Sequence, residues 1–353
     1  MQNIADRLKQ ARLASGLSQR ALAEKAGPLS AMAISKYEKN QATPGSDVLL
    51  RLAKALGVKF EYFFRPVEVK LTKPEYRRHS GFSEKQRSAL ENRILEKLER
   101  YLAVEEVFGP NSFPSFHNEK LDFEIKEIKD AERAADLLRK KWHLGGDPID
   151  NVCETLEDHG VKVILIEEDN RKFDGFSAWA NKNIAVIAVK DQKDGDRLRF
   201  DLAHELSHLL LKIGGNLDPE RACHRFAAAF LVPEEAVRRE FPLARKRLSF
   251  EELYLLKHKW GFSMQAWLRR LLDSNIISKT LYTQACIEFG KQGWRKKEPG
   301  ASVKPERTNR FVRITWQALS EGLISYSRAS ELLGEPADEV RRKISWPEEV
   351  EVA

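Results

Sequence analysis

The first 65 residues alternate between short amphipathic stretches of helical period and small polar breaks. Gly16 ends the first stretch, and Ser18 and Ser30 stand where helix N-caps are expected. The pattern therefore predicts a bundle of short helices within residues 1–66. The expected helices cover residues 4–13, 18–25, 30–39, 47–56 and 59–64.

The next stretch, residues 67–130, is highly charged and mostly helical in pattern. Between Phe82 and Phe108, leucine and isoleucine recur every four residues, at Leu90, Ile94, Leu98 and Leu102. This stripe predicts a connecting helix that packs on its neighbours. Residues 109–114, which include glycine and two prolines, break the helix.

Beyond residue 130 the pattern changes from purely helical to mixed. Residues 131–142 have helical period, and β-branched runs at 161–166 and 184–189 predict strands. Residues 301–353 add helices over 310–322 and 325–333, without a chemical motif or an internal repeat. We expect an α+β fold that is mainly α, with a small sheet beside a helical core. The predicted domains are residues 1–66, 67–130, 131–300 and 301–353.

Charge is concentrated in the N-terminal bundle. The chain has a formal net charge of +7, and residues 1–70 hold 12 Lys and Arg against 6 Asp and Glu. Taken alone, this excess fits nucleic-acid binding and an ordinary soluble surface equally well.

Three widely spaced cysteines fit a reducing cytosol. Because no apolar run approaches the ~18–20 residues of a membrane span, a cytoplasmic protein without membrane contact is expected.

The most informative local motif is His-Glu-x-x-His at residues 204–208. Two histidines four apart on a helix share a face, so His204 and His208 can reach one zinc ion. Glu205 can then take a proton from an attacking water, as in metallopeptidases. The alternative is a helix with hydrogen-bonded core histidines. The leucines around the motif disfavour it, because burying this trio without partners is costly.

A third metal ligand is expected on the next helix, which starts near Pro219. Glu220 and His224 are four residues apart on one face of that helix. With Glu220 as a carboxylate ligand, the site would have the His2Glu donor set of catalytic zinc. Cys223 points elsewhere on the helix and is interpreted as core packing.

The motif Arg-Phe-x-Leu-Ala-His-Glu-Leu-x-His, followed by Glu-x-x-Ala/Cys-x-x-Phe-Ala-x-x-x-Leu-x-Pro, resembles the ImmA/IrrE metallopeptidases over roughly residues 131–300. The resemblance implies Zn²⁺ bound by His204, His208 and Glu220, with Glu205 as general base. The family usually has Asn or Asp where His224 stands. His224 is interpreted as orienting a ligand histidine, with a role as competing ligand as the alternative.

Near the N-terminus, Leu17-Ser-Gln-Arg-Ala-Leu-Ala-Glu-Lys-Ala-Gly27 and Ile34-Ser-Lys-Tyr-Glu-Lys-Asn40 resemble the Xre/Cro/C1 helix-turn-helix family. The resemblance implies binding to a double-stranded DNA operator, usually as a homodimer on two half-sites. Pro28 and Leu29 lengthen the turn by one residue relative to the usual pattern. A bundle that serves only as an interaction module is the alternative. The residues expected to contact DNA are Gln19, Ala31, Met32, Ser35, Lys36, Lys39 and Asn40, while Ile34 packs inward.

Together the two resemblances imply a DNA-binding transcriptional regulator with a zinc-dependent endopeptidase domain. Its expected protein substrate is a repressor or antitoxin-like protein. In the alternative hypothesis the regulator is non-catalytic, and its peptidase-like domain senses a ligand or metal. Glu205 favours the first hypothesis, because a pure sensor has no need of a general base. A third hypothesis, an antitoxin-type repressor of a neighbouring gene, is compatible with either.

Overall fold

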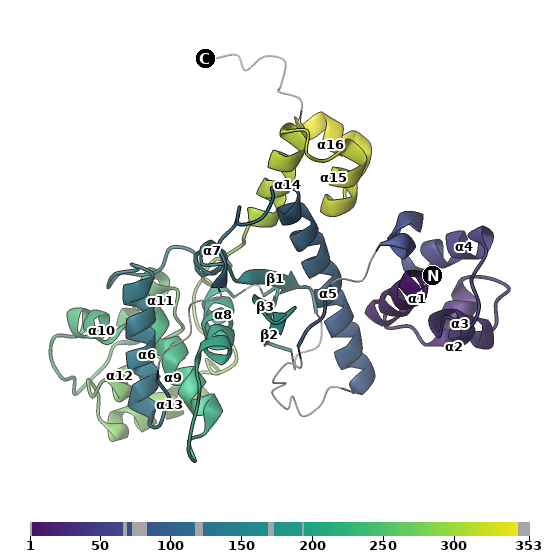
Figure 1. Cartoon of the computed structure of the whole chain (residues 1–353). Coiled ribbons are helices and arrows are strands. Elements are labelled where there is room, and N and C mark those ends of the chain that lie inside the picture. The colour runs from purple at the N-terminus through teal and green to yellow at the C-terminus, as the bar shows by residue number, and fades with distance from the viewer. Residues whose placement is uncertain are drawn as a thin grey trace. The chain divides into compact units, whose positions relative to one another are not determined.

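The computed structural model describes residues 2–65, 69–72, 83–116, 123–168, 173–192 and 194–344. Helices dominate and one small sheet is present, which confirms the α+β, mainly α fold (Figure 1). The chain divides into two compact units, Met1–Leu71 with Tyr76–Val107, and Thr72–Glu75 with Phe108–Ala353. None of the described helices combines the length and the apolar character that a membrane crossing requires. The domain boundaries at residues 66, 130 and 300 remain predictions.

The N-terminal unit begins with the expected bundle of short helices. Ser18 Oγ accepts a hydrogen bond from Ala21 N, and Ser30 Oγ accepts one from Ala33 N, as N-caps do. The last short helix is a 3₁₀ helix. The elements are α1 (Gln2–Ala14), α2 (Gln19–Lys25), α3 (Ala31–Glu38), α4 (Ser46–Leu56) and η1 (Phe60–Phe64). Their core includes the fully buried side chains of Leu8, Leu22, Ile34, Leu52 and Phe63.

The predicted connecting helix is α5 (Glu84–Glu106), which packs on α1 within the N-terminal unit. A capping box of Ser83 and Gln86 starts it, and the predicted start at Phe82 lies outside the described residues. Its buried stripe follows the prediction through Leu98 and then continues at Tyr101 and Val104, with Leu102 only half-buried. A true helix has 3.6 residues per turn, so a stripe with steps of four drifts off the buried face.

The second unit holds the sheet and the motif helix. The strands β1 (Lys162–Ile166), β2 (Gly175–Ala180) and β3 (Ile184–Lys190) lie in the order β1-β3-β2, with β1 parallel and β2 antiparallel to β3. The two β-branched runs are the predicted strands, whereas β2 was not predicted. It lacks β-branched residues and pairs through small and aromatic ones.

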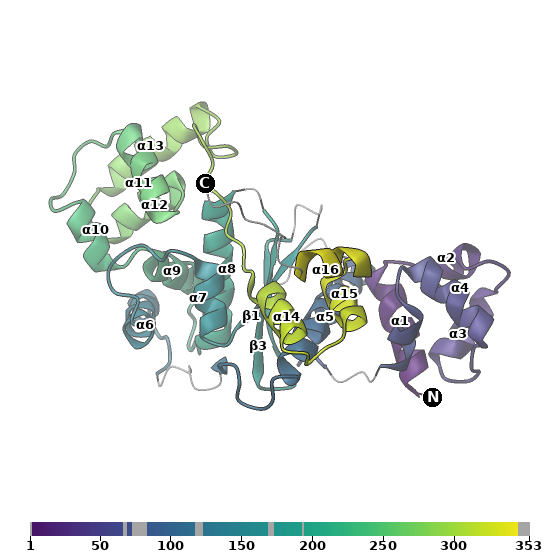
Figure 2. The same cartoon turned by 90° about the horizontal axis from the view of Figure 1, so that it is seen from above.

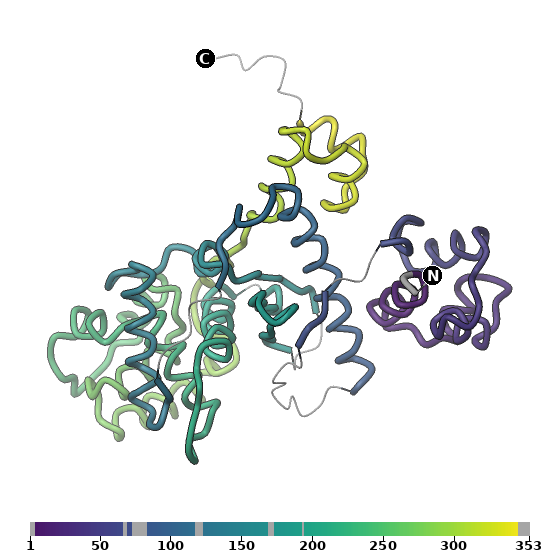
Figure 3. Tube along the Cα trace, in the orientation of Figure 1, coloured from purple at the N-terminus to yellow at the C-terminus, as the bar shows by residue number. Residues whose placement is uncertain are grey.

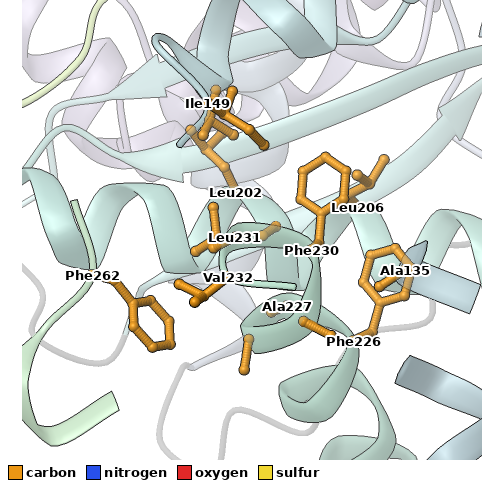
Figure 4. Packing of buried hydrophobic residues seen from close by; sticks show 14 of the residues in the cluster. Ala135, Ile149, Leu202, Leu206, Phe226, Ala227, Phe230, Leu231, Val232 and Phe262 are labelled. Carbon is orange, nitrogen blue, oxygen red and sulfur yellow. The ribbon is translucent and has the colours of Figure 1, made fainter. Parts of the chain in front are cut away.

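Two helices of this unit form the centre of its core. The motif helix α8 (Gly195–Leu210) packs on β2, β3 and α9 (Pro219–Leu231), and α9 also packs on α6 (Ile128–Lys141). Leu202 and Leu206 of α8 lie near Phe226 and Phe230 of α9, with Ala135 of α6 beside them (Figure 4). The other helices of this part are α7 (Val152–Asp158), α10 (Glu234–Glu240), α11 (Phe250–Trp260), α12 (Met264–Asp273) and α13 (Lys279–Lys291).

Residues 298–309 have no helix or strand and run across this core; we call them the C-terminal strap (Figure 2). The strap supplies hydrogen-bond partners to three helix N-termini. Val303 O accepts from Gly195 N of α8, Glu306 accepts from Val152 N of α7, and Glu298 accepts from Met264 N of α12. The helices α14 (Arg310–Ser320), α15 (Tyr326–Leu333) and α16 (Ala337–Ile344) follow (Figure 3).

Candidate metal centre

The motif helix α8 presents its functional side chains to two different neighbours. His204 and Glu205 are buried, with 3% and 5% of their surface exposed, and His208 is half-buried. The histidines face α9, where Glu220, Cys223 and His224 lie. Glu205 faces β2 instead. Successive helical positions diverge by about 100°, so one short motif can address a metal site and a strand at once.

The start of α9 fixes the position of Glu220. Asp218 is the N-cap, its Oδ1 accepts from Glu220 N at 3.1 Å, and Pro219 occupies the first helical position. His204 Nε2 lies 3.9 Å from Glu220 Oε2, and His208 Nε2 lies 3.9 Å from Glu220 Oε1. The two histidine Nε2 atoms are 3.1 Å apart. The three side chains that the sequence nominated as ligands therefore converge on one point.

This donor set fits zinc. Ligand atoms placed tetrahedrally at about 2.1 Å from a zinc ion lie about 3.4 Å from each other. The separations of 3.1 and 3.9 Å bracket that value. Two imidazoles and one carboxylate also match the His2Glu set of catalytic zinc sites, which keep one coordination position for water or substrate.

His224 lies beside the same point. Its metal-binding atom and those of His204 and Glu220 all lie within 4.8 Å of one another. The rings of His204 and His224 have centroids 4.8 Å apart, and Phe200 contacts both rings. The point is therefore surrounded by four potential ligands, and the role of His224 stays a prediction.

One contact at the metal centre was missed by the sequence reasoning. Cys223 was interpreted as core packing, and it is fully buried, but its Sγ lies 3.7 Å from His208 Nδ1. The second nitrogen of a ligand histidine commonly has a partner that fixes the ring. The sequence did contain a signal for this contact. Cys223 stands three residues after Glu220, which places it about one helical turn further along the same helix, α9.

The environment of Glu205 depends on β2. Ser177 Oγ donates a hydrogen bond of 2.7 Å to Glu205 Oε2. Gly175 lies against the same carboxylate: a Cβ atom there would stand 2.8 Å from Glu205 Cγ and 2.9 Å from Oε1. Glycine is thus required for the close approach of strand and side chain. No residue of the segment 173–177 was predicted from the sequence to belong to the site.

The same strand carries backbone groups at its outer edge, away from β3. Asp174 O and Ala180 O accept from Lys190 N and Asn183 N on the β3 side. Trp179 O accepts from Thr72 N on the opposite side. Because the direction alternates along a strand, the N–H and C=O groups of Gly175 and Ser177 also point to the outer edge.

Asp201 on α8 interacts electrostatically with two other carboxylates, those of Asp174 and Glu205. Burial, and secondarily repulsion from Asp174, raises the pKa of Asp201 to about 8. Asp201 lies one turn before Glu205 on α8 and accepts a hydrogen bond of 2.5 Å from Gln192.

A cavity of about 820 Å³ adjoins the other side of the metal centre. It is lined by Glu220 and His224, by the aromatic rings of Phe200 and Phe262, and by arginines that include Arg221 and Arg269.

In the N-terminal unit, most residues nominated for DNA contact lie on α3. Met32, Lys36, Lys39 and Asn40 are exposed, Ala31 and Ser35 are half-buried, and Ile34 is fully buried as expected. Gln19 Nε2 donates to Glu38 Oε2, and Glu38 also pairs with Arg12. Gln19 therefore helps to join α2 to α3. The structure contains no DNA, so the contacts themselves remain predictions.

Comparison with known proteins supports the two resemblances. A family model described as Helix-turn-helix matches residues 8–63, and a peptidase family model described as IrrE N-terminal-like domain matches residues 156–272. No curated protein and no solved structure matches the chain. The chain therefore carries an N-terminal Xre-type helix-turn-helix domain, of the kind that binds DNA, and a metallopeptidase-type domain of the ImmA/IrrE family.

Proposed function

We propose that this protein is a DNA-binding transcriptional regulator whose zinc-dependent endopeptidase cleaves a repressor or antitoxin-like protein. The observation that carries the proposal is the pairing of two features on α8. His204 and His208 converge with Glu220, while Glu205 is held apart from them by Ser177 on β2. A regulator that only senses metal has no use for a separately positioned base.

In this mechanism His204, His208 and Glu220 would hold the zinc ion, and His224 would orient the imidazole of His204. Zinc, when bound, polarises the scissile carbonyl and acidifies water. Glu205 takes one proton from the attacking water and returns it to the nitrogen of the leaving amine. Water is consumed, the C–N bond breaks, and a carboxylic acid and an amine form. Ser177 keeps the Glu205 carboxylate in place through this cycle.

The outer edge of β2 is where we place the substrate chain. Backbone groups of Gly175 and Ser177 lie at this edge next to Glu205, so an extended peptide can pair with them. Pairing through the backbone brings a peptide bond close to the base without selecting its side chains. The 820 Å³ cavity beside Glu220 is then available for a substrate side chain.

The proposal also includes the regulatory context. The protein binds its operator as a homodimer in the cytoplasm, and cleavage of its protein substrate changes gene expression. A peptidase joined to a DNA-binding domain is suited to act on few proteins near its operator, because tethering raises the local concentration of what is bound there.

The test is a cleavage assay with purified full-length protein, Zn²⁺ and candidate repressors encoded near its gene. Glu205→Gln is compared with the parent and with Glu154→Gln, which removes an exposed carboxylate on α7. We expect cleavage by the parent and the control, and a loss of roughly 10²–10⁴-fold in Glu205→Gln. Bound zinc without cleavage of any candidate, together with normal regulation by Glu205→Gln in cells, would favour the non-catalytic sensor.

A further inference from the structure

The three helices after the C-terminal strap form a small bundle with its own core, which the metal centre does not use. α14 packs on α15, and α15 packs on α16. Both family models end before this bundle begins. Its buried apolar side chains are Ile314, Ala318, Leu319, Ala329, Leu332 and Val340. Residues 310–344 therefore have a packed fold without an assigned role.

The pair α15–α16 repeats the local design of the helix-turn-helix pair α2–α3. Ser18 and Ser325 are both N-caps, and each accepts a hydrogen bond from the backbone N–H three residues later, at 3.0 and 3.2 Å. Gly27 and Gly334 each stand nine residues after the cap, with positive φ angles of 100° and 72°. A glycine with positive φ thus follows each short helix, directly after α15 and after the cap residue Ala26 of α2.

The same register extends to the helix before each pair. Positions 307 residues apart correspond. Several matching side chains are buried in both bundles, although buried Ala5 corresponds to Val312, which is 41% exposed. Leu8 corresponds to Thr315 and Ala11 to Ala318, with exposed fractions of 0–3%. Because the match is in spacing and burial, with different residue types at most positions, the sequence alone shows no repeat.

The turn is where the two pairs differ. Ile34, which anchors α3 in its core, stands seven residues after Gly27, whereas Val340 stands six residues after Gly334. The N-terminal turn carries the additional residue at Pro28-Leu29. The C-terminal pair therefore has the usual helix-turn-helix spacing that the N-terminal pair exceeds by one residue.

Helix α16 begins with two exposed acids, Asp338 and Glu339, and its second half carries three cations. One of these cations, Lys343, pairs with Glu335 at 2.7 Å. With the shorter turn taken into account, Ser35 and Lys36 of α3 correspond to Arg341 and Arg342, and Lys343 follows. All three side chains on α16 are exposed. Guanidinium groups bind phosphate and the edge of guanine with paired N–H donors. Asp338, which forms an exposed ion pair with Arg341 at 3.5 Å, corresponds to Met32.

We propose that residues 310–344 are a second helix-turn-helix that binds double-stranded DNA through α16, with Arg341 and Arg342 as its main contacts. The protein would then carry two DNA-binding modules in one chain. Two linked modules bind more tightly than either alone when the DNA offers both sites. This inference does not depend on whether the peptidase is active.

The test uses full-length protein that carries Lys36→Ala, which weakens the N-terminal module, and a fluorescent duplex of about 30 base pairs. Arg341→Gln with Arg342→Gln is compared with Arg247→Gln with Lys279→Gln, which removes two exposed cations outside residues 310–344. Anisotropy titrations at several salt concentrations give Kd and its salt dependence. We expect the α16 variant to bind roughly tenfold more weakly, with a salt slope smaller by about two, and the control to change little.

Equal affinities and salt slopes for the α16 variant and its control would overturn the proposal, provided that circular dichroism shows both are folded. The proposal also fails if the α16 variant binds DNA normally but loses cleavage of the protein substrate, because α16 would then bind protein. Loss of DNA binding with cleavage unchanged supports it. If neither parent nor variant cleaves any candidate, the DNA measurements still decide, since they involve no peptidase activity.

Discussion

The N-terminal bundle and the metal centre place their functional residues in opposite ways. On α3, two of the four nominated DNA-contacting residues are exposed and two are half-buried. The helix is held by its Ser30 cap, by Ile34 and by contacts within its own bundle. At the metal centre, His204 and Glu205 are buried, and their partners come from α9 and β2. A surface needs only a correctly oriented helix, whereas a catalytic site needs several distant segments in register.

The strap shows how far that dependence extends. Glu306 forms a buried ion pair with Arg199 on the motif helix, more than 100 residues earlier, and also accepts from Val152 N. α3 also has a buried ion pair, between Glu38 and Arg12, but its partners are only 26 residues apart and belong to one small bundle. The two regions should therefore respond differently to substitutions far from their functional residues.

The largest effect is expected from Glu306→Ala. It leaves the Arg199 guanidinium buried without its carboxylate, which typically costs about 3–5 kcal/mol of unfolding free energy. Urea unfolding of the second unit measures the loss. Ser30→Ala in the N-terminal bundle is the counterpart, with an expected cost of about 1 kcal/mol. Equal losses for the two variants would contradict the contrast between long-range and local support.

Gly175→Val tests whether β2 positions the base. The new side chain would collide with Glu205, so we expect cleavage to fall about 100-fold while zinc is retained, because misplacing a catalytic group by about 1 Å has that effect. Kinetics with a cleaved substrate and metal analysis make the measurement. Gly45→Val, at a glycine with open space around it in the N-terminal unit, serves as control. Unchanged cleavage in Gly175→Val would remove the argument for β2.

Asp201→Asn tests the electrostatics of the buried helix. The folded-state pKa of Asp201, about 8, is above its usual value of 3.8, so folding favours the protonated carboxyl. Its stabilising contribution is complete below about pH 4 and is lost as the pH rises through about 8. Between these limits the unfolding free energy of the parent should decline with pH, and Asp201→Asn should make that decline shallower. Parallel pH profiles of parent and variant would refute the shift.

The smallest effect is expected from Lys36→Ala on the exposed face of α3. Operator binding should weaken by less than about tenfold, with a salt slope smaller by about one, since one phosphate contact is lost. Cleavage and zinc binding should not change, because the substitution lies in the other unit. A variant whose salt slope equals that of the parent would show that Lys36 does not contact the DNA backbone.

Much of the fold was predictable because its signals are local. Ser18, Ser30 and the β-branched strands follow from cap chemistry and side-chain shape. The strand β2 was missed because its alanines and glycine have no such preference, and it is a strand only because β3 pairs with it. The buried stripe of α5 was predicted correctly from Leu90 to Leu98. Beyond Leu98 the buried positions are Tyr101 and Val104 and not Leu102, because a helix has 3.6 residues per turn.

The sequence by itself determined which residues are proposed to bind the metal and to act as the base. His204, Glu205, His208 and Glu220 are readable because a helix turns four-residue spacing into a shared face. Only the tertiary structure decided what surrounds them. Cys223 beside His208, Ser177 on Glu205 and Glu306 on Arg199 depend on segments brought together by the core. Contacts between distant segments follow from packing the whole chain, so no local pattern announces them.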